Sequence, residues 1–114
     1  MARLVTEEVF GPILPVVAYR DFDEAIAYVN ARPRPLALYH FDRDERRISR
    51  ALTETVAGGV TINDTILHIA QDDLPFGGVG PSGMGQYHGR DGFDAFSKRT
   101  GVFRQGRGNS IGLV

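Results

Sequence analysis

The chain has 114 residues, 42% of them hydrophobic and 24% charged, proportions that are typical of one soluble globular domain. A formal net charge of -1 leaves no broad positive surface for nucleic acid or anionic lipid, so no nucleic acid and no membrane partner is expected. The absence of cysteine excludes disulfides, thiolate metal ligands and a thiol nucleophile within these residues. No apolar run suits a signal peptide or a membrane span, and we therefore expect a cytoplasmic protein.

The first regular element is expected at residues 12–19, a short apolar run rich in β-branched side chains that is typical of a buried strand. Its two prolines indicate a sheet edge or a bend. Asp21 lies three residues before Glu24, as in a capping box, and apolar residues recur at helical spacing after it. These signals predict a helix over residues 22–31, which ends before Pro33.

The same pattern is then repeated along the chain. A second strand is expected at residues 36–41, followed by a helix capped by Asp42 and Glu45. That helix carries an apolar stripe at helical spacing, and Gly58 or Gly59 is expected to end it. The repetition predicts alternating strands and helices in the first half of the chain.

A third strand is expected at residues 59–63, so the order β-α-β-α-β predicts an α/β fold with a three-layer parallel sheet unit covered by helices. Beyond Asn63 the periodicity stops, and the glycine-rich residues 74–85 are expected to form a loop. A short helix is expected near residues 90–96, and a terminal strand at residues 98–105.

Several separated blocks of the sequence match one known family. Residues 7–12, and residues 74–78 with 82–85, resemble the E-[IV]-F-G-P and P-F-G-G…S-G-x-G blocks of the aldehyde dehydrogenase superfamily. Residues 30–39 and 84–89 further resemble the class 3 branch, most closely the bacterial coniferyl aldehyde dehydrogenases. Because the blocks keep their order across nearly the whole chain, together they are a much stronger signal than any single motif.

The resemblance implies an incomplete enzyme. Residues 7–97 correspond to the C-terminal part of the catalytic domain, and residues 98–105 are the candidate for a strand that joins two subunits in a homodimer. Residues 106–114 depart from the family pattern and are expected to form a frayed tail. In the family, a cysteine thiolate attacks the aldehyde, hydride passes to NAD or NADP, and a glutamate-activated water releases the acid. The nucleophile, the general base and the cofactor turn belong to segments upstream of Glu7. We therefore expect no catalytic residue here, no cofactor bound by the chain alone, and no activity.

Two residues are implied at the cofactor site of the complete enzyme. By the E-x-F pattern, Glu8 corresponds to the carboxylate that hydrogen-bonds the nicotinamide ribose, and Phe10 to the aromatic that packs on the nicotinamide. The alternative interpretation makes Glu8 a solvated charge and Phe10 a core anchor.

The class 3 resemblance also implies four residues at the aldehyde pocket: Ile69, Ala70, Phe76 and His88. An apolar tunnel suits aromatic or medium-chain aldehydes, of which coniferyl aldehyde is an example. The alternative is that Phe76 packs against the sheet and that His88 donates to a backbone carbonyl, and the residue types alone do not separate the two interpretations.

Other patterns carry less weight. Residues 78–83 fit G-x-G-x-x-G, but they neither follow a strand nor open a helix, so no dinucleotide turn is predicted. The widely spaced histidines His40, His68 and His88 predict no metal site and favour surface or hydrogen-bonded roles. The second expected helix interleaves arginines with acidic residues, which indicates a solvated face of ion pairs: Arg43, Arg46, Arg47 and Arg50.

A second hypothesis comes from a different class of function. If other strands of the sheet lie outside this chain, its sheet edge presents unpaired N–H and C=O groups. The chain is then a binding or assembly module that pairs with a full-length relative through that edge and its tail. Under the first hypothesis the partner is a small-molecule aldehyde, whereas under the second it is another protein chain.

Overall fold

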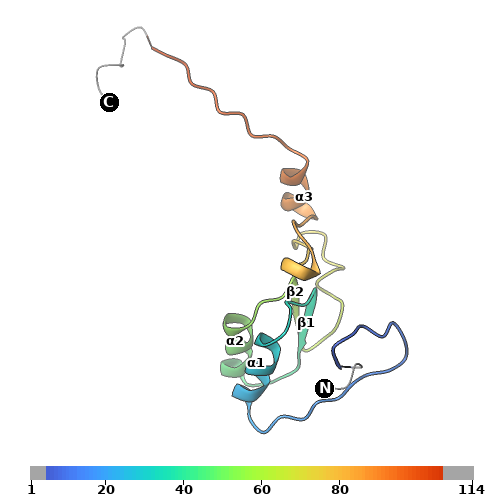
Figure 1. Ribbon diagram of the computed structural model, residues 1–114. Helices are drawn as coiled ribbons and strands as arrows, with labels where there is room; N and C mark the ends of the chain where they lie inside the picture. Colours follow the sequence, from blue (N-terminus) through green and yellow to red (C-terminus); the bar gives the residue numbers. More distant parts are fainter. Residues whose placement is uncertain (1–4, 107–114) are drawn as a thin grey trace.

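The computed structural model describes residues 5–106, which form an α/β unit with a long C-terminal extension (Figure 1). The α/β class predicted from the sequence is confirmed, and the helices expected at residues 22–31 and 90–96 lie within one residue of the observed ones. In chain order the elements are α1 (Phe22–Asn30), β1 (Ala37–His40), α2 (Glu45–Glu54), β2 (Gly59–Ile62), the 3-10 turn η2 (Gly80–Ser82) and α3 (Gly89–Ala95).

The sheet consists of β1 and β2, which pair in parallel with Ala37 opposite Gly59 and His40 opposite Ile62. Helix α2 connects the two strands, and α1 lies beside α2 next to the sheet (Figure 1). Because α1 and α2 contact each other, they form a single helix layer. Within residues 5–106 the unit therefore has two layers, and the third layer of the expected architecture is not formed.

The strand expected at residues 12–19 is not formed either. These residues are extended but unpaired, and the side chains of Leu14 and Val16 are each 85% exposed. A strand is stable only where a neighbour satisfies its N–H and C=O groups, and the two prolines of this segment remove two donors. The apolar composition marks a segment that is suited to burial, whereas a strand also requires a partner.

Helix α1 begins as the capping-box pattern predicts. Asp21 has an extended backbone at the N-cap, and its Oδ1 accepts the Glu24 N–H at 2.9 Å. The Glu24 carboxylate reaches one residue further back than the motif requires and accepts the Arg20 N–H at 2.8 Å. The start of this helix is therefore fixed by local side chains alone.

The predicted ends of α2 are wrong at both termini. Asp44, and not Asp42, is the N-cap, and its carboxylate accepts the Arg46 N–H at 2.9 Å. The helix ends at Glu54, where Thr55 turns to an extended backbone before Gly58 is reached. Two aspartates in close succession both suit a cap, and the spacing of apolar residues does not distinguish them.

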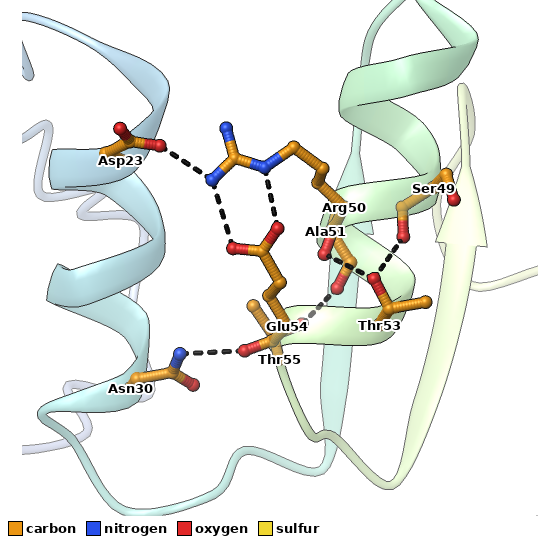
Figure 2. Close-up of polar contacts among 8 residues, drawn as sticks. All are labelled: Asp23, Asn30, Ser49, Arg50, Ala51, Thr53, Glu54 and Thr55. Atoms are coloured by element: carbon orange, nitrogen blue, oxygen red, sulfur yellow. Dashed lines mark hydrogen bonds and ion pairs between the residues drawn. The ribbon is translucent and has the colours of Figure 1, made fainter.

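Polar contacts join the two helices (Figure 2). Arg50 on α2 donates from Nη2 to Asp23 on α1 at 2.6 Å and from Nε to Glu54 at 2.6 Å. The carboxylates of Glu54 and Asp23 raise the pKa of the Arg50 guanidinium above its usual range. The Asn30 amide donates to the Glu54 carbonyl at 2.7 Å, near the end of α2. The ion-paired face predicted for this helix is thereby confirmed at Arg50.

The buried apolar side chains form a small core between the helices and the sheet. Among the described residues they are Ile26, Ile48 and Ala51, with exposed fractions of 9%, 8% and 2%. Many large apolar side chains remain exposed, among them Phe10, Met84 and Phe96. No helix among residues 5–106 has the length and apolar character needed to cross a membrane.

The residues after α3 project away from the rest of the molecule (Figure 1). Residues 98–105, expected as a terminal strand, form no hydrogen-bonded strand in the single chain and are exposed. Pairing of this segment with a second subunit stays a prediction. Of the expected frayed tail at residues 106–114, all but residue 106 lies outside the described residues.

Candidate functional site

The glycine-rich loop is closed at its base by a two-way backbone bridge. The Phe76 N–H donates to the Tyr87 carbonyl at 2.8 Å, and the Tyr87 N–H donates back to Phe76 at 2.9 Å. Between these residues the chain makes only the short turn η2. The loop predicted from the glycines is confirmed, and the bridge gives it a defined shape.

Inside the loop, the two glycine blocks of the sequence pack backbone against backbone. A Cβ atom on Gly77 would overlap the carbonyl oxygen of Gly85, and one on Gly78 would overlap the carbonyl of Ser82. Gly85 itself has a φ of 77°, in the left-handed region that favours glycine. The P-F-G-G and S-G-x-G blocks are thus two sides of one contact, which explains why glycine is required in both.

The loop brings two predicted pocket residues together. The rings of Phe76 and His88 stack with centroids 5.9 Å apart and planes 26° apart. Tyr87 lies edge-on to both, at 5.5 Å from Phe76 and 4.7 Å from His88. His88 Nδ1 is buried and has no hydrogen-bond partner within residues 5–106, so the alternative in which this nitrogen donates to a backbone carbonyl is not supported. Phe76 and His88 form one aromatic wall.

An open groove of about 670 Å³ borders this wall. Phe76 and Tyr87 line it together with Leu36, just before β1, and Phe96, just after α3. Of the four predicted pocket residues only Phe76 lines this groove, whereas Ile69, Ala70 and His88 do not. Phe96 is 96% exposed and Met84, on the same groove, is 95% exposed. Such a surface suits an apolar or aromatic ligand, or apolar side chains from outside the chain.

The other two predicted pocket residues lie in the turn that follows β2. Ile69 is 36% exposed and Ala70 is also exposed. The Ile69 N–H donates to the Ile66 carbonyl at 2.8 Å, which closes the turn. His68, immediately before Ile69, contacts Phe76 with ring centroids 6.3 Å apart. The turn is therefore connected to the aromatic wall through His68.

The predicted cofactor residues lie in the N-terminal segment. Glu8 is exposed and borders an open hollow of about 770 Å³, which Arg32, Arg34 and Ser82 also line. The Phe10 side chain is 91% exposed, so its alternative as a core anchor is wrong. Ser82 also borders the groove beside Phe76. An accessible carboxylate and an accessible ring fit what a ribose and a flat nicotinamide need.

Sequence reasoning gave no site role to His68, which is buried at 6% exposure. Its Nδ1 lies 2.8 Å from the hydroxyl of Thr61, a β2 residue that is also buried. The alternation of side chains along the strand is the one sequence signal that places Thr61 on the buried face. It does not predict the bond to His68, because an irregular turn separates the two residues. Among the described residues, no group of three or more histidine, aspartate or glutamate side chains is arranged to hold a metal ion.

Fold and site together define a class: a parallel α/β unit with a glycine-rich loop and an open apolar groove beside the amino ends of its two strands. The sequence profile of the aldehyde dehydrogenase family matches residues 1–102. The chain therefore belongs to the aldehyde dehydrogenase family, and the resemblance stated from the sequence blocks is confirmed.

Individual relatives agree with this assignment. A probable coniferyl aldehyde dehydrogenase of Pseudomonas aeruginosa is 57% identical over 98% of this chain and 24% of the relative. The mouse aldehyde dehydrogenase family 3 member A2 is 50% identical over 96% of this chain and 23% of its own length. The substrate-bound structure of Staphylococcus aureus AldH superimposes with a TM-score of 0.85 at 48% identity, covering 96% of this chain and 24% of that one. The chain spans about a quarter of these proteins.

Proposed function

We propose that these residues form the C-terminal part of the catalytic domain of an NAD(P)-dependent aldehyde dehydrogenase that oxidises aromatic aldehydes such as coniferyl aldehyde to carboxylic acids. The observation that carries the proposal is the contact between the two glycine blocks, which closes the loop and stacks Phe76 on His88 beside an open groove. The identity of 57% to a probable coniferyl aldehyde dehydrogenase supports the substrate class.

In this proposal the aromatic wall binds and orients the aldehyde. Phe76 lines the groove and offers an apolar ring against which an aromatic ring packs with offset or edge-to-face geometry, while His88 stacks on Phe76 and supports it. The groove beside them excludes water from one side of the substrate. Substrate preference is thereby assigned to this part of the chain.

Glu8 and Phe10 would hold the cofactor. The Glu8 carboxylate accepts hydrogen bonds from the two ribose hydroxyls, and the exposed Phe10 ring packs against the nicotinamide. Bound NAD or NADP supplies the hydride acceptor of the reaction. No cysteine is present among the 114 residues, so the thiolate that attacks the aldehyde comes from outside them.

The proposal is tested with the chain alone and with a chimera. The purified 114-residue chain is expected to produce no NADH or NADPH from coniferyl aldehyde or benzaldehyde and to bind neither cofactor. A chimera in which this chain replaces the matching quarter of the Pseudomonas aeruginosa relative is expected to be active. An inactive but folded chimera would contradict the proposal, as would turnover by the chain alone.

Substitution of the wall sharpens this test. In the chimera, Phe76→Ala is expected to lower kcat/KM for benzaldehyde by about tenfold to a hundredfold, because the ring loses its stacking surface. Phe41→Ala removes an equally large ring at the far end of β1 and serves as the control. Equal losses of kcat/KM in the two variants would contradict the assignment of Phe76 to the aldehyde pocket.

A second proposal is favoured by the exposed apolar surface. Phe96 and Phe103 are 96% and 86% exposed, and residues 98–106 extend without a partner. A chain with such a surface pairs with another polypeptide, either a full-length relative or a second copy through the segment at residues 98–105. Nucleic acid and membranes are not proposed as partners, and the cytoplasm is the proposed compartment.

Size-exclusion chromatography separates the two proposals. Co-elution of the 114-residue chain with the intact Pseudomonas aeruginosa relative supports the assembly module. A dimer of the chain alone that is lost on deletion of residues 98–106 supports pairing between copies. Elution of the chain as a monomer, with no binding to the intact relative, contradicts the assembly-module proposal.

A further inference from the structure

His68 and Thr61 form a buried polar pair between the turn after β2 and the strand itself. His68 and Thr61 are the buried polar side chains among residues 5–106, with exposed fractions of 6% and 8%. The Thr61 hydroxyl and His68 Nδ1 lie 2.8 Å apart, so the two groups satisfy each other where water is excluded. An isolated polar group at this depth would be costly, and the pair is therefore a defined structural link between β2 and the turn after it.

A glycine fixes the imidazole from the strand side. A Cβ atom on Gly59 would overlap His68 Cδ2 and would lie 2.9 Å from Nε2. Gly59 and Thr61 are two positions apart on β2, so they share one face of the strand. The Cδ2–Nε2 edge of the imidazole thus lies against Gly59 while Thr61 bonds its Nδ1, and the two contacts together restrict the orientation of the ring.

His68 Nδ1 is the nitrogen that links the imidazole to β2, since Nε2 is buried and has no partner within the described residues. Either tautomer makes this bond, because Nδ1–H can donate to the hydroxyl oxygen and the Thr61 O–H can donate to Nδ1.

The imidazole also contacts the aromatic wall. Its centroid lies 6.3 Å from that of Phe76 and 6.0 Å from that of Tyr39 on β1. Phe76 in turn stacks on His88 at 5.9 Å. A continuous set of ring contacts therefore runs from the sheet through His68 to the wall of the groove.

We propose that His68 is a positioning residue, which uses its bond to Thr61 to hold Phe76 and the adjoining Ile69 in the orientation that shapes the aldehyde pocket. His68 acts through Phe76 and touches no reacting atom. This inference rests on the proposed function, since it assigns to His68 the selectivity between aromatic and small aldehydes. Rigid support of a contact residue matters because a displacement of about 1 Å costs up to a hundredfold in rate.

The test uses the active chimera described above and compares benzaldehyde with acetaldehyde. Thr61→Val keeps the volume but removes the hydroxyl, and the ratio of kcat/KM for benzaldehyde to that for acetaldehyde is expected to fall by about tenfold. Thr61→Ser keeps the hydroxyl and is expected to stay within about twofold of the unchanged ratio. Thr53→Val removes a hydroxyl on α2 that bonds the Ser49 carbonyl, and it serves as the control.

The ratio distinguishes positioning from folding. A loss of folded enzyme lowers both kcat/KM values equally and leaves their ratio unchanged, and that result would overturn the inference. If Thr61→Val yields no soluble protein, Tyr39→Leu removes the β1 ring that contacts His68 and is expected to lower the ratio by about threefold. An unchanged ratio there also overturns the inference, whereas an inactive unsubstituted chimera contradicts the proposed function itself.

Discussion

Asp42 and Arg47 form a bidentate ion pair, in which Nε donates to Oδ2 at 2.6 Å and Nη2 donates to Oδ1 at 2.8 Å. The same Oδ1 accepts the backbone N–H groups of Arg43 at 2.7 Å and Asp44 at 2.9 Å. His40 Nε2 approaches Oδ2 at 3.8 Å. One carboxylate therefore joins the end of β1, the connecting turn and the first turns of α2.

The first prediction concerns the stability of the folded chain at low pH. The hydrogen bonds from Arg47 and from the Asp44 N–H hold the pKa of the Asp42 carboxyl well below its usual range. A carboxyl whose pKa is depressed on folding contributes stability above its unfolded pKa of about 3.9, and that contribution is lost as the pH falls below this value. Urea unfolding between pH 7 and pH 3 should show the onset of this loss, which is complete only below the folded pKa. Asp42→Asn is expected to be less stable at pH 7 and to depend less on pH, while Asp72→Asn, at an exposed position, should follow the unsubstituted chain.

The second prediction concerns the glycine contacts. Gly77→Ala places a methyl group against the Gly85 carbonyl, where backbone must move, and it is expected to cost about 1–3 kcal/mol of unfolding free energy. Gly101→Ala meets nothing within 4 Å and should change stability by less than about 0.5 kcal/mol. Chemical denaturation of the two variants side by side provides the measurement. Similar values for both would show that the close approach does not exist in solution.

The third prediction concerns the small core. Ile48 on α2 is 8% exposed, and Ile48→Ala is expected to lower the free energy of unfolding by about 2–4 kcal/mol, or to abolish a cooperative transition. Leu52→Ala on the same helix starts from 50% exposure and should cost less than about 1 kcal/mol. Thermal unfolding followed by circular dichroism compares them. A larger loss at Leu52 would place the core on a different face of α2.

The fourth prediction concerns Asn63, at the end of β2. Its φ of 58° lies in the left-handed region, and its Oδ1 accepts the Asp42 N–H at 2.9 Å. Asn63→Ala loses the bond and adds backbone strain, which together should cost about 2 kcal/mol. Asn63→Gly loses only the bond and should cost about 1 kcal/mol less than the alanine variant. Urea midpoints would reveal the order, and a more stable alanine variant would contradict it.

Local signals explain which parts of the fold were predictable from the sequence. Asp21 and its helix were placed correctly because a cap and an apolar stripe act within a few residues of each other. Residues 12–19 were assigned wrongly because the same composition serves a strand only when a neighbouring strand is present. Asp42 is expected as a cap because its spacing to Glu45 fits a capping box. In the structure its carboxylate pairs with Arg47 instead, and residue spacing does not give the direction of the Arg47 side chain.

The candidate site divides in the same way. Phe76 and His88 were identified through the family blocks. Their stacking depends on the backbone bridge between Phe76 and Tyr87, which no periodicity in the sequence predicts. The Thr61–His68 bond joins a strand to a turn through burial, and burial is a property of the folded chain. Sequence patterns therefore identified the residues of the wall but not the residues behind it.

The backbone contacts of Gly58, Gly77 and Gly85 have an evolutionary consequence. A Cβ on Gly58 would overlap the Gly77 carbonyl, and one on Gly77 would overlap the Gly85 carbonyl, so three successive layers of main chain are stacked without intervening side chains. Because this surface is made of main chain, amino-acid substitution cannot change its shape in small steps. Divergence in ligand preference is therefore confined to the rings around this stack, and relatives with different preferences should differ there while sharing the glycines.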